Sequence, residues 1–155
     1  VWSTQFKTEQ KRKQKEIAIG DFKANYRPQY FRNAHQILEN INNGKELIID
    51  ARSSGRFTGT DPEPRTEIRS GHIPHSKNLP FGTVLNEGNL HSIDHLEKLF
   101  HVYAAKSDSV VFSCGSGITA CILMLAATFV GYEKVAIYDG SWTEWGSLLE
   151  LPIEI

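Results

Sequence analysis

The chain has 155 residues, of which 40% are hydrophobic and 23% are charged, and its formal net charge is -1. This length is enough for one sizeable core, and a charge so close to zero gives no argument for nucleic acid or an anionic membrane as a partner. With two cysteines and no apolar run of about 18 residues or more, neither a disulfide framework nor a membrane span is expected. We therefore expect one domain in a reducing compartment, which is the cytoplasm, or the mitochondrion if a transit peptide precedes Val1.

The amino-terminal residues are polar and contain a basic cluster. No apolar stripe is evident before Ile17 and Ile19, so we interpret residues 1–21 as a linker or arm and residues 22–155 as the folded domain. Runs of charge are usually solvated chain, which disfavours a nucleic-acid role for this cluster. Its members are Lys7, Lys11, Arg12, Lys13 and Lys15.

The first predicted elements are a helix and a buried strand. An apolar stripe at helical spacing predicts a helix over residues 33–42, which Gly44 ends. A short apolar run at residues 46–50 is typical of a strand buried on both faces of a parallel sheet. The long polar loop that follows, residues 53–71, is of the kind that usually carries function.

The remaining predicted elements again alternate between strand and helix. They are an extended segment at residues 77–80, a helix at 92–105, a strand at 109–113, a helix at 120–130, a strand at 134–138 and a short helix at 142–149. This alternation predicts an α/β fold, a small parallel sheet with helices on both faces. In such sheets the site lies at the carboxyl ends of the strands, so the loops at residues 50–56, 114–119 and 139–142 should gather at one edge.

Cys114 follows one of these strands directly and precedes a glycine-rich turn that opens a helix. Backbone N–H groups and the positive end of the helix dipole converge at such a turn, so a sulfur atom there should ionise readily and act as a nucleophile. Gly115 and Gly117 leave room for the backbone to approach the sulfur. The alternative is a buried structural cysteine beside an ordinary turn, which the surrounding sequence disfavours.

The second cysteine, Cys121, is too far along the predicted helix to pair with Cys114. The helical rise separates the two by about 10 Å, beyond the disulfide limit of about 7 Å. We interpret Cys121 as a small buried hydrophobic residue, with a resolving or regulatory thiol as the alternative.

Five motifs occur in order between residues 22 and 151. They are Asp50-Ala51-Arg52 with Gly55-Arg56-Phe57, Pro62-Glu63-Pro64-Arg65, Gly71-His72-Ile73-Pro74, Cys114-Gly115-Ser116-Gly117-Ile118-Thr119-Ala120 and Tyr138-Asp139-Gly140-Ser141-Trp142. Together they resemble the carboxyl-terminal catalytic domain of the two-domain rhodanese-like sulfurtransferases. The uncharged pair after Cys114 resembles the members that use 3-mercaptopyruvate, whereas members that prefer thiosulfate typically carry basic residues there.

The resemblance implies a rhodanese-like domain and two-step sulfur transfer without cofactor or metal. Cys114 would take sulfur from 3-mercaptopyruvate as a persulfide, release pyruvate, and pass the sulfur to thioredoxin, a small dithiol or cyanide. The partners implied are therefore a small sulfur donor, a thiol acceptor and an amino-terminal rhodanese-like domain of the same protein, with no nucleic acid and no membrane.

Site roles follow from the same resemblance. Arg56 and Arg65 would grip the donor, because guanidinium forks suit a planar carboxylate. Ser116 resembles a residue that handles protons, and Thr119 would bind substrate or cap the helix. The backbone of Gly115, Ser116, Gly117, Ile118 and Thr119 would hold the persulfide anion. Asp50, His72 and Trp142 would have supporting roles, chiefly structural for the first two, and Arg52 and Arg69 are weaker candidates.

Three other functions compete with this interpretation. A thiosulfate sulfurtransferase would use the same persulfide, and a non-catalytic rhodanese-like module would commonly lack the cysteine. A cysteine phosphatase needs an arginine at the sixth position after its cysteine, where this chain has Ala120. His91 and His95 have the i, i+4 spacing of zinc ligands, but no third ligand is evident and we interpret them as a surface pair.

Overall fold

The computed structural model describes residues 20–155. The basic cluster and nearly all of the expected arm lie in residues 1–19, outside the described residues. The first regular element is the 3-10 helix η1 (Pro28–Tyr30), beyond the expected start at Phe22, whose side chain is 89% exposed. None of the described helices is long and apolar enough to cross a membrane.

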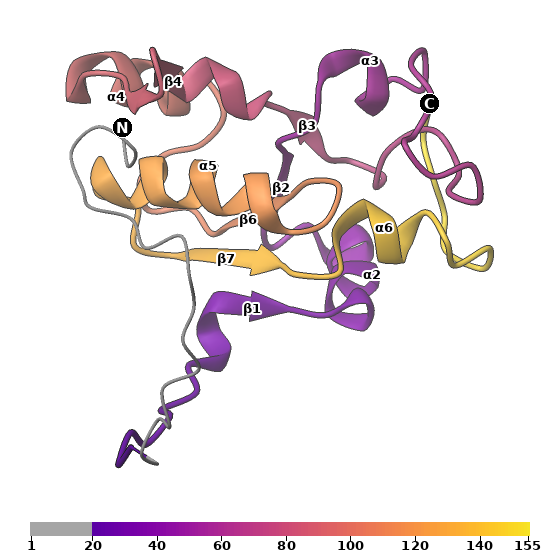
Figure 1. Cartoon of the computed structure of the whole chain (residues 1–155), viewed down its shortest axis with the longest axis horizontal. Coiled ribbons are helices and arrows are strands. Elements are labelled where there is room, and N and C mark those ends of the chain that lie inside the picture. The colour runs from indigo at the N-terminus through magenta and orange to yellow at the C-terminus, as the bar shows by residue number, and fades with distance from the viewer. Residues whose placement is uncertain (1–19) are drawn as a thin grey trace, which may run out of the picture.

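A parallel sheet forms the centre of the fold, as predicted, and it has five strands (Figure 1). Its strands lie in the order β1 (Phe31–Arg32), β7 (Val135–Tyr138), β6 (Val110–Ser113), β2 (Leu47–Asp50) and β3 (Lys77–Asn78). The three central strands are almost wholly buried. They are the three apolar runs that the sequence identifies, because strands buried on both faces show no polar alternation.

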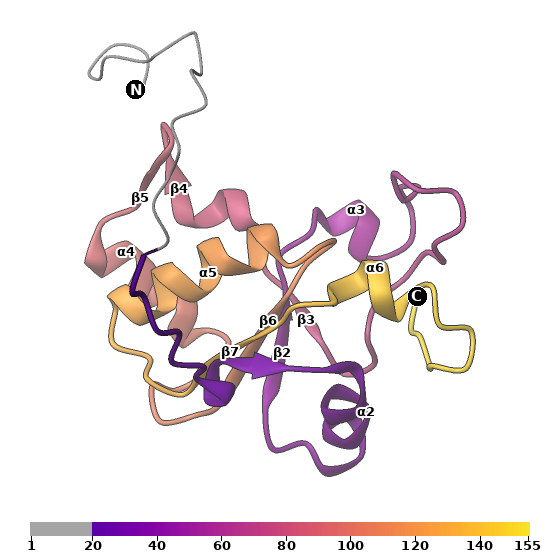
Figure 2. The ribbon, with the colours of Figure 1, turned by 60° about the horizontal axis from the view of Figure 1, so that its bottom comes forward.

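Helices cover both faces of this sheet, which confirms the expected layers (Figure 2). On one face α4 (Ile93–His101) and α5 (Ile118–Phe129) pack over β6 and β7, around Leu96, Phe100, Phe112 and Leu123. On the other face α2 (Ala34–Asn43) and α6 (Ser141–Trp145) enclose a second cluster that includes Ile37, Tyr138, Trp142 and Trp145. Burial of these side chains stabilises the sheet from both sides.

The first helix begins and ends where its sequence predicts. The side chain of Asn33 accepts a hydrogen bond from the N–H of Gln36, whose own side chain accepts from the N–H of Asn33, a reciprocal capping box. Gly44 ends the helix in the left-handed conformation, with φ of 62°.

Two other helices are shorter than predicted, for identifiable reasons. The α4 helix ends at His101, because the following turn places the hydroxyl of Tyr103 on the carbonyl of Asn78. The α6 helix ends at Trp145, where the guanidinium of Arg69 donates to the carbonyl of that residue and to three carbonyls of the turns that follow. Those carbonyls belong to Trp145, Gly146, Leu148 and Leu151.

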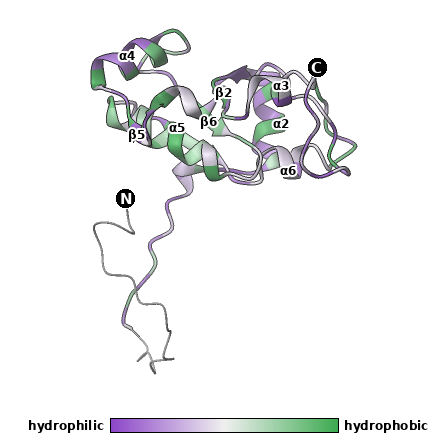
Figure 3. Ribbon diagram, turned by 45° about the horizontal axis from the view of Figure 1, so that its top comes forward, coloured by the Kyte–Doolittle hydropathy of each residue, from purple (hydrophilic) through white to green (hydrophobic). Residues whose placement is uncertain are grey.

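Several short elements were not predicted. They are η1, β1, the one-turn helix α3 (Ser54–Phe57) inside the long loop, the 3-10 helix η2 (Phe81–Val84), and the hairpin of β4 (Leu85–Asn86) with β5 (Asn89–Leu90). Segments of two to four residues are too short to show a hydrophobic period. The helices differ in hydropathy, and α5 is hydrophobic along most of its length (Figure 3).

Candidate active site

The loops after β2, β6 and β7 meet at one edge of the sheet. The N–H of Trp142 donates to the carbonyl of Cys114 at 2.9 Å, which joins the loops after β7 and β6. The loop after β2 reaches the same place, because a β-carbon on Gly115 would lie 3.1 Å from Nη2 of Arg56. The structure therefore brings together residues that lie far apart in the sequence.

Cys114 is the first residue after β6, and it is only 1% exposed. The turn that follows leads to Gly117, the residue before α5, which has φ of 81°. A β-carbon on Gly117 would lie 2.9 Å from the carbonyl oxygen of Asp139. The left-handed conformation and this close approach both require glycine.

In the turn after Cys114, the first two carbonyl groups are hydrogen-bonded, whereas several N–H groups are not. The carbonyl of Cys114 accepts from Trp142, and the carbonyl of Gly115 accepts from the N–H and the hydroxyl of Thr143, at 2.8 and 2.6 Å. Within the described part of the chain, the N–H groups of residues 116–119 have no acceptor. Unpaired N–H groups at the start of a helix stabilise a nearby anion.

Arg56 lies on α3 with 27% of its side chain exposed. Its Nη2 donates to Oε2 of Glu63 at 2.5 Å, and its Nε donates to Oε1 of the same residue at 3.2 Å. The guanidinium is thus held in one orientation against Gly115 by a bidentate pair.

Glu63 belongs to a buried ionic chain that the sequence alone did not identify. Its side chain is 3% exposed, and Oε1 also accepts from Nη1 of Arg52 at 2.8 Å. Arg52 in turn pairs with Asp50 at 2.8 Å, and its guanidinium carbon lies 4.5 Å from the centre of the Trp142 ring. Charges alternate along this chain, so each buried ion has a partner.

A cavity of about 230 Å³ opens beside these ion pairs. Arg65 also lines it, exposed, and makes no ion pair with any of the described residues. The two guanidinium groups and one carboxylate at the cavity leave one positive charge in excess. The lining consists of Arg56, Glu63, Pro64, Arg65, Ile68, Gly115, Ser116 and Thr143.

Other predicted site residues lie outside this cavity. Trp142 is fully buried in the core, and its indole N–H donates to the carbonyl of Arg69. The Nδ1 atom of His72 bonds the carbonyl of Phe57 at 2.9 Å, with the two rings stacked. The side chain of Ile118 is 73% exposed, while Thr119 is half-buried.

The prediction that Cys121 is buried was wrong. Cys121 is exposed on α5, and its thiol donates to the carbonyl of Gly117 at 3.3 Å. Partial burial, together with the neighbouring Cys114 and Asp139, raises the pKa of this thiol. Both cysteines are free, as the helical spacing predicted.

His91 and His95 are stacked with ring centres 4.1 Å apart. The part of the chain that the structure describes holds no group of three or more residues able to bind a metal ion.

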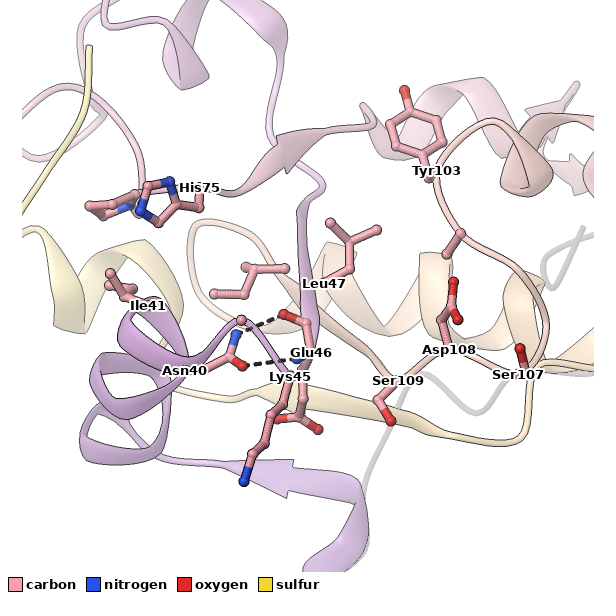
Figure 4. A pocket seen from close by; sticks show the side chains of 14 residues that line it. Asn40, Ile41, Lys45, Glu46, Leu47, His75, Tyr103, Ser107, Asp108 and Ser109 are labelled. Carbon is pink, nitrogen blue, oxygen red and sulfur yellow. Dashed lines mark hydrogen bonds between the residues drawn. The ribbon is translucent and has the colours of Figure 1, made fainter.

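A larger hollow, about 600 Å³, lies at the opposite edge of the sheet (Figure 4). Asn40 forms one wall, and its amide bonds both the N–H and the carbonyl of Glu46. Tyr103 and Asp108 lie across from it. No predicted site residue lines this hollow, so its size does not mark the candidate site.

Besides Glu63, two further polar residues of the candidate site were missed. Thr143 lines the cavity, and Ser141 accepts a hydrogen bond from the N–H of Cys114 at 3.1 Å. Ser141 lies in the segment after β7 that was expected to reach the site, and Thr143 lies one residue beyond that segment, on α6. That position is the signal that identifies them.

Comparison with known proteins gives consistent results. The family model described as "Rhodanese-like domain" matches residues 33–148. A 3-mercaptopyruvate sulfurtransferase of Mus musculus is 43% identical over 127 residues, which cover 81% of this chain and 43% of the mouse protein. A thiosulfate/3-mercaptopyruvate sulfurtransferase of Arabidopsis thaliana, named as mitochondrial, is 43% identical over 135 residues, or 86% of this chain and 36% of the plant protein.

Among solved structures, a 3-mercaptopyruvate sulfotransferase of Escherichia coli superposes with a TM-score of 0.67 at 32% identity. The match covers 79% of this chain and 46% of that one. The chain therefore spans less than half the length of these relatives.

Proposed function

The chain belongs to the rhodanese-like domain family, and on that premise we propose that it transfers sulfur from 3-mercaptopyruvate to a thiol acceptor or cyanide. The carrier would be a persulfide on Cys114. One observation supports this most strongly: the cysteine lies at a turn whose N–H groups at residues 116–119 are unpaired, beside a cavity lined by two guanidinium groups. The names of the mouse and bacterial relatives agree with this donor.

In the first step, the thiolate of Cys114 attacks the sulfur of the donor and the carbon–sulfur bond breaks. The electron pair of the carbon–sulfur bond passes to the carbon atom, which then takes the proton of the donor's thiol. Pyruvate leaves, and a persulfide anion stays on Cys114. We assign Ser116, which lines the cavity, to the transfer of that proton. The N–H groups of residues 116–119 would stabilise the persulfide anion.

The arginines would orient the donor during this step. Arg56 is fixed by Glu63, and Arg65 lines the same cavity with no described carboxylate paired to it. A planar carboxylate and an adjacent keto oxygen can each accept from a guanidinium fork. Binding by both arginines would hold the donor sulfur near Cys114.

In the second step, the thiolate of an acceptor attacks the outer sulfur, and the sulfur–sulfur bond breaks to restore the thiolate of Cys114. Thioredoxin or a small dithiol is the acceptor that we propose, and cyanide serves in an assay.

Thiosulfate is the alternative donor, and the Arabidopsis relative carries both donors in its name. Thiosulfate bears two negative charges, whereas the cavity has one excess positive charge. The single carboxylate of 3-mercaptopyruvate matches that charge better, because an unbalanced charge is costly to desolvate. The same persulfide would form with either donor.

Steady-state turnover with each donor and cyanide tests this proposal. We expect kcat/KM to favour 3-mercaptopyruvate, and we expect mass spectrometry of the donor-treated protein to find one additional sulfur atom on Cys114. Preference for thiosulfate would establish the alternative donor. If neither donor adds sulfur to Cys114, the proposed chemistry is wrong.

An exposed apolar stripe on α5 supports a further part of the proposal, the second domain of the same protein. Ile118, Leu125 and Phe129 are 73%, 61% and 57% exposed, and their helical spacing places them on one side. No charged residue occurs in this helix. A helix that is apolar all round is normally buried, and the relatives have more than twice the aligned length. We propose that a second rhodanese-like domain covers this stripe.

Hydrogen exchange in this chain and in the longest natural form of the protein tests this arrangement. The amides of residues 118–129 are expected to exchange more slowly in the longer form, because a covered helix opens less often. Residues 34–43, on the far face of the sheet, serve as the control and should exchange at the same rate in both. Equal rates at residues 118–129 would contradict the proposal that a second domain covers this stripe.

A further inference from the structure

Ser141 has a strained backbone and a fully buried side chain. Its φ is 51°, in the left-handed region that favours glycine, and its exposed fraction is 0%. Its neighbour Gly140 has an ordinary φ of -59°, so the glycine of this turn does not occupy the left-handed position. Backbone strain of this kind persists where surrounding contacts hold it and is concentrated at functional sites.

The hydroxyl of Ser141 joins Cys114 to the end of β7. Its Oγ accepts from the N–H of Cys114 at 3.1 Å and donates to the carbonyl of Tyr138 at 2.8 Å. The next residue, Trp142, donates its N–H to the carbonyl of Cys114 at 2.9 Å. Ser141 and Trp142 therefore hold both backbone groups of the cysteine.

These hydrogen bonds from Ser141 and Trp142 determine which backbone groups remain available to bind the sulfur. The N–H and the carbonyl of Cys114 are both occupied by the first residues of α6, and the carbonyl of Gly115 is occupied by Thr143. The N–H groups of residues 116–119 are among the groups left without a partner in the described structure. A carbonyl oxygen that turned toward an anionic sulfur would repel it, and the bond from Trp142 keeps the carbonyl of Cys114 directed to α6.

We propose that Ser141 is a positioning residue for Cys114, whose hydroxyl fixes the cysteine peptide so that the sulfur faces the unpaired N–H groups. The inference rests on the proposed role of Cys114 as the nucleophile. It assigns a function to the strain, because glycine would fit the left-handed backbone but would leave the N–H of Cys114 without its acceptor.

The test measures alkylation of Cys114 by iodoacetamide as a function of pH, which requires no sulfur donor. The background is Cys121→Ser, which leaves a single thiol and whose hydroxyl can still donate to Gly117. Ser141→Gly and Ser141→Ala are compared with Ser147→Ala. Ser147 also carries a hydroxyl close to α6, but it bonds the carbonyl of Thr143 and does not contact Cys114.

Both Ser141 variants are expected to react about fivefold more slowly at neutral pH, the equivalent of one hydrogen bond. The pH at half-maximal rate should rise in both, while Ser147→Ala should match the background. Ser141→Gly should also fold well, because glycine relieves the strain. If it retains the background rate and pH profile, the hydroxyl does not position Cys114 and the proposal is overturned.

A change in unfolding alone would likewise overturn the proposal in favour of a structural tie between β7 and α6. A shifted alkylation profile in a protein that transfers no sulfur would retain the positioning role and reject the proposed function. The two inferences can therefore fail separately.

Discussion

Replacement of Cys114 by serine is expected to abolish sulfur transfer with either donor, with kcat falling by at least about a thousandfold. A serine hydroxyl in the same turn is far less ionised than a thiol and cannot form a persulfide. The fold should persist, because the side chain is nearly isosteric and the backbone bonds to Ser141 and Trp142 remain. Thiocyanate production from cyanide measures the loss, and urea unfolding checks the fold.

Cys121→Ser is the matched control for this prediction. Cys114 directly precedes the lining residues Gly115 and Ser116, whereas Cys121 is exposed on α5, and its raised pKa keeps its thiol protonated at neutral pH. This variant should therefore turn over like the parent. Sulfur transfer that survives in Cys114→Ser but disappears in Cys121→Ser would move the nucleophile to α5 and contradict the proposed site.

The three central strands and the first helix could be predicted because the signals that define them are local in the sequence. Each central strand is a continuous apolar run, and α2 carries its own cap at Asn33 and its own stop at Gly44. The short strand β1 has no such signal, because it is defined only by its pairing with β7. The length of α6 likewise depends on Arg69, which lies far away in the sequence.

The candidate site shows the same division. Cys114 and the glycines around it form one contiguous segment, so their geometry can be inferred from their order. Glu63 and Ser141 stand inside the quoted motifs, yet their contacts are made with residues from other segments. An ion pair or hydrogen bond between distant segments can be identified only when both residues are placed in the structure.

Glu63→Gln should have the second largest effect, because it removes the charge that links Arg52 to Arg56. Both guanidinium groups lose an ionic partner, and that of Arg52 is only 1% exposed. Breaking a buried ion pair from one side costs about 3 kcal/mol, so the free energy of unfolding in urea should fall by about that amount. Asp50 still balances Arg52, which should keep the variant folded.

The same substitution should change the choice of donor. Loss of the bidentate pair lets Arg56 move from its orientation against Gly115, which should lower kcat/KM for 3-mercaptopyruvate by roughly tenfold or more. The cavity also gains one net positive charge, so the ratio of kcat/KM values should shift toward the doubly charged thiosulfate. Glu67→Gln removes an equal charge from an exposed position in the same loop, with no ion pair among the described residues. An equal shift in both variants would mean that overall charge, and not the contact between Glu63 and Arg56, sets the preference.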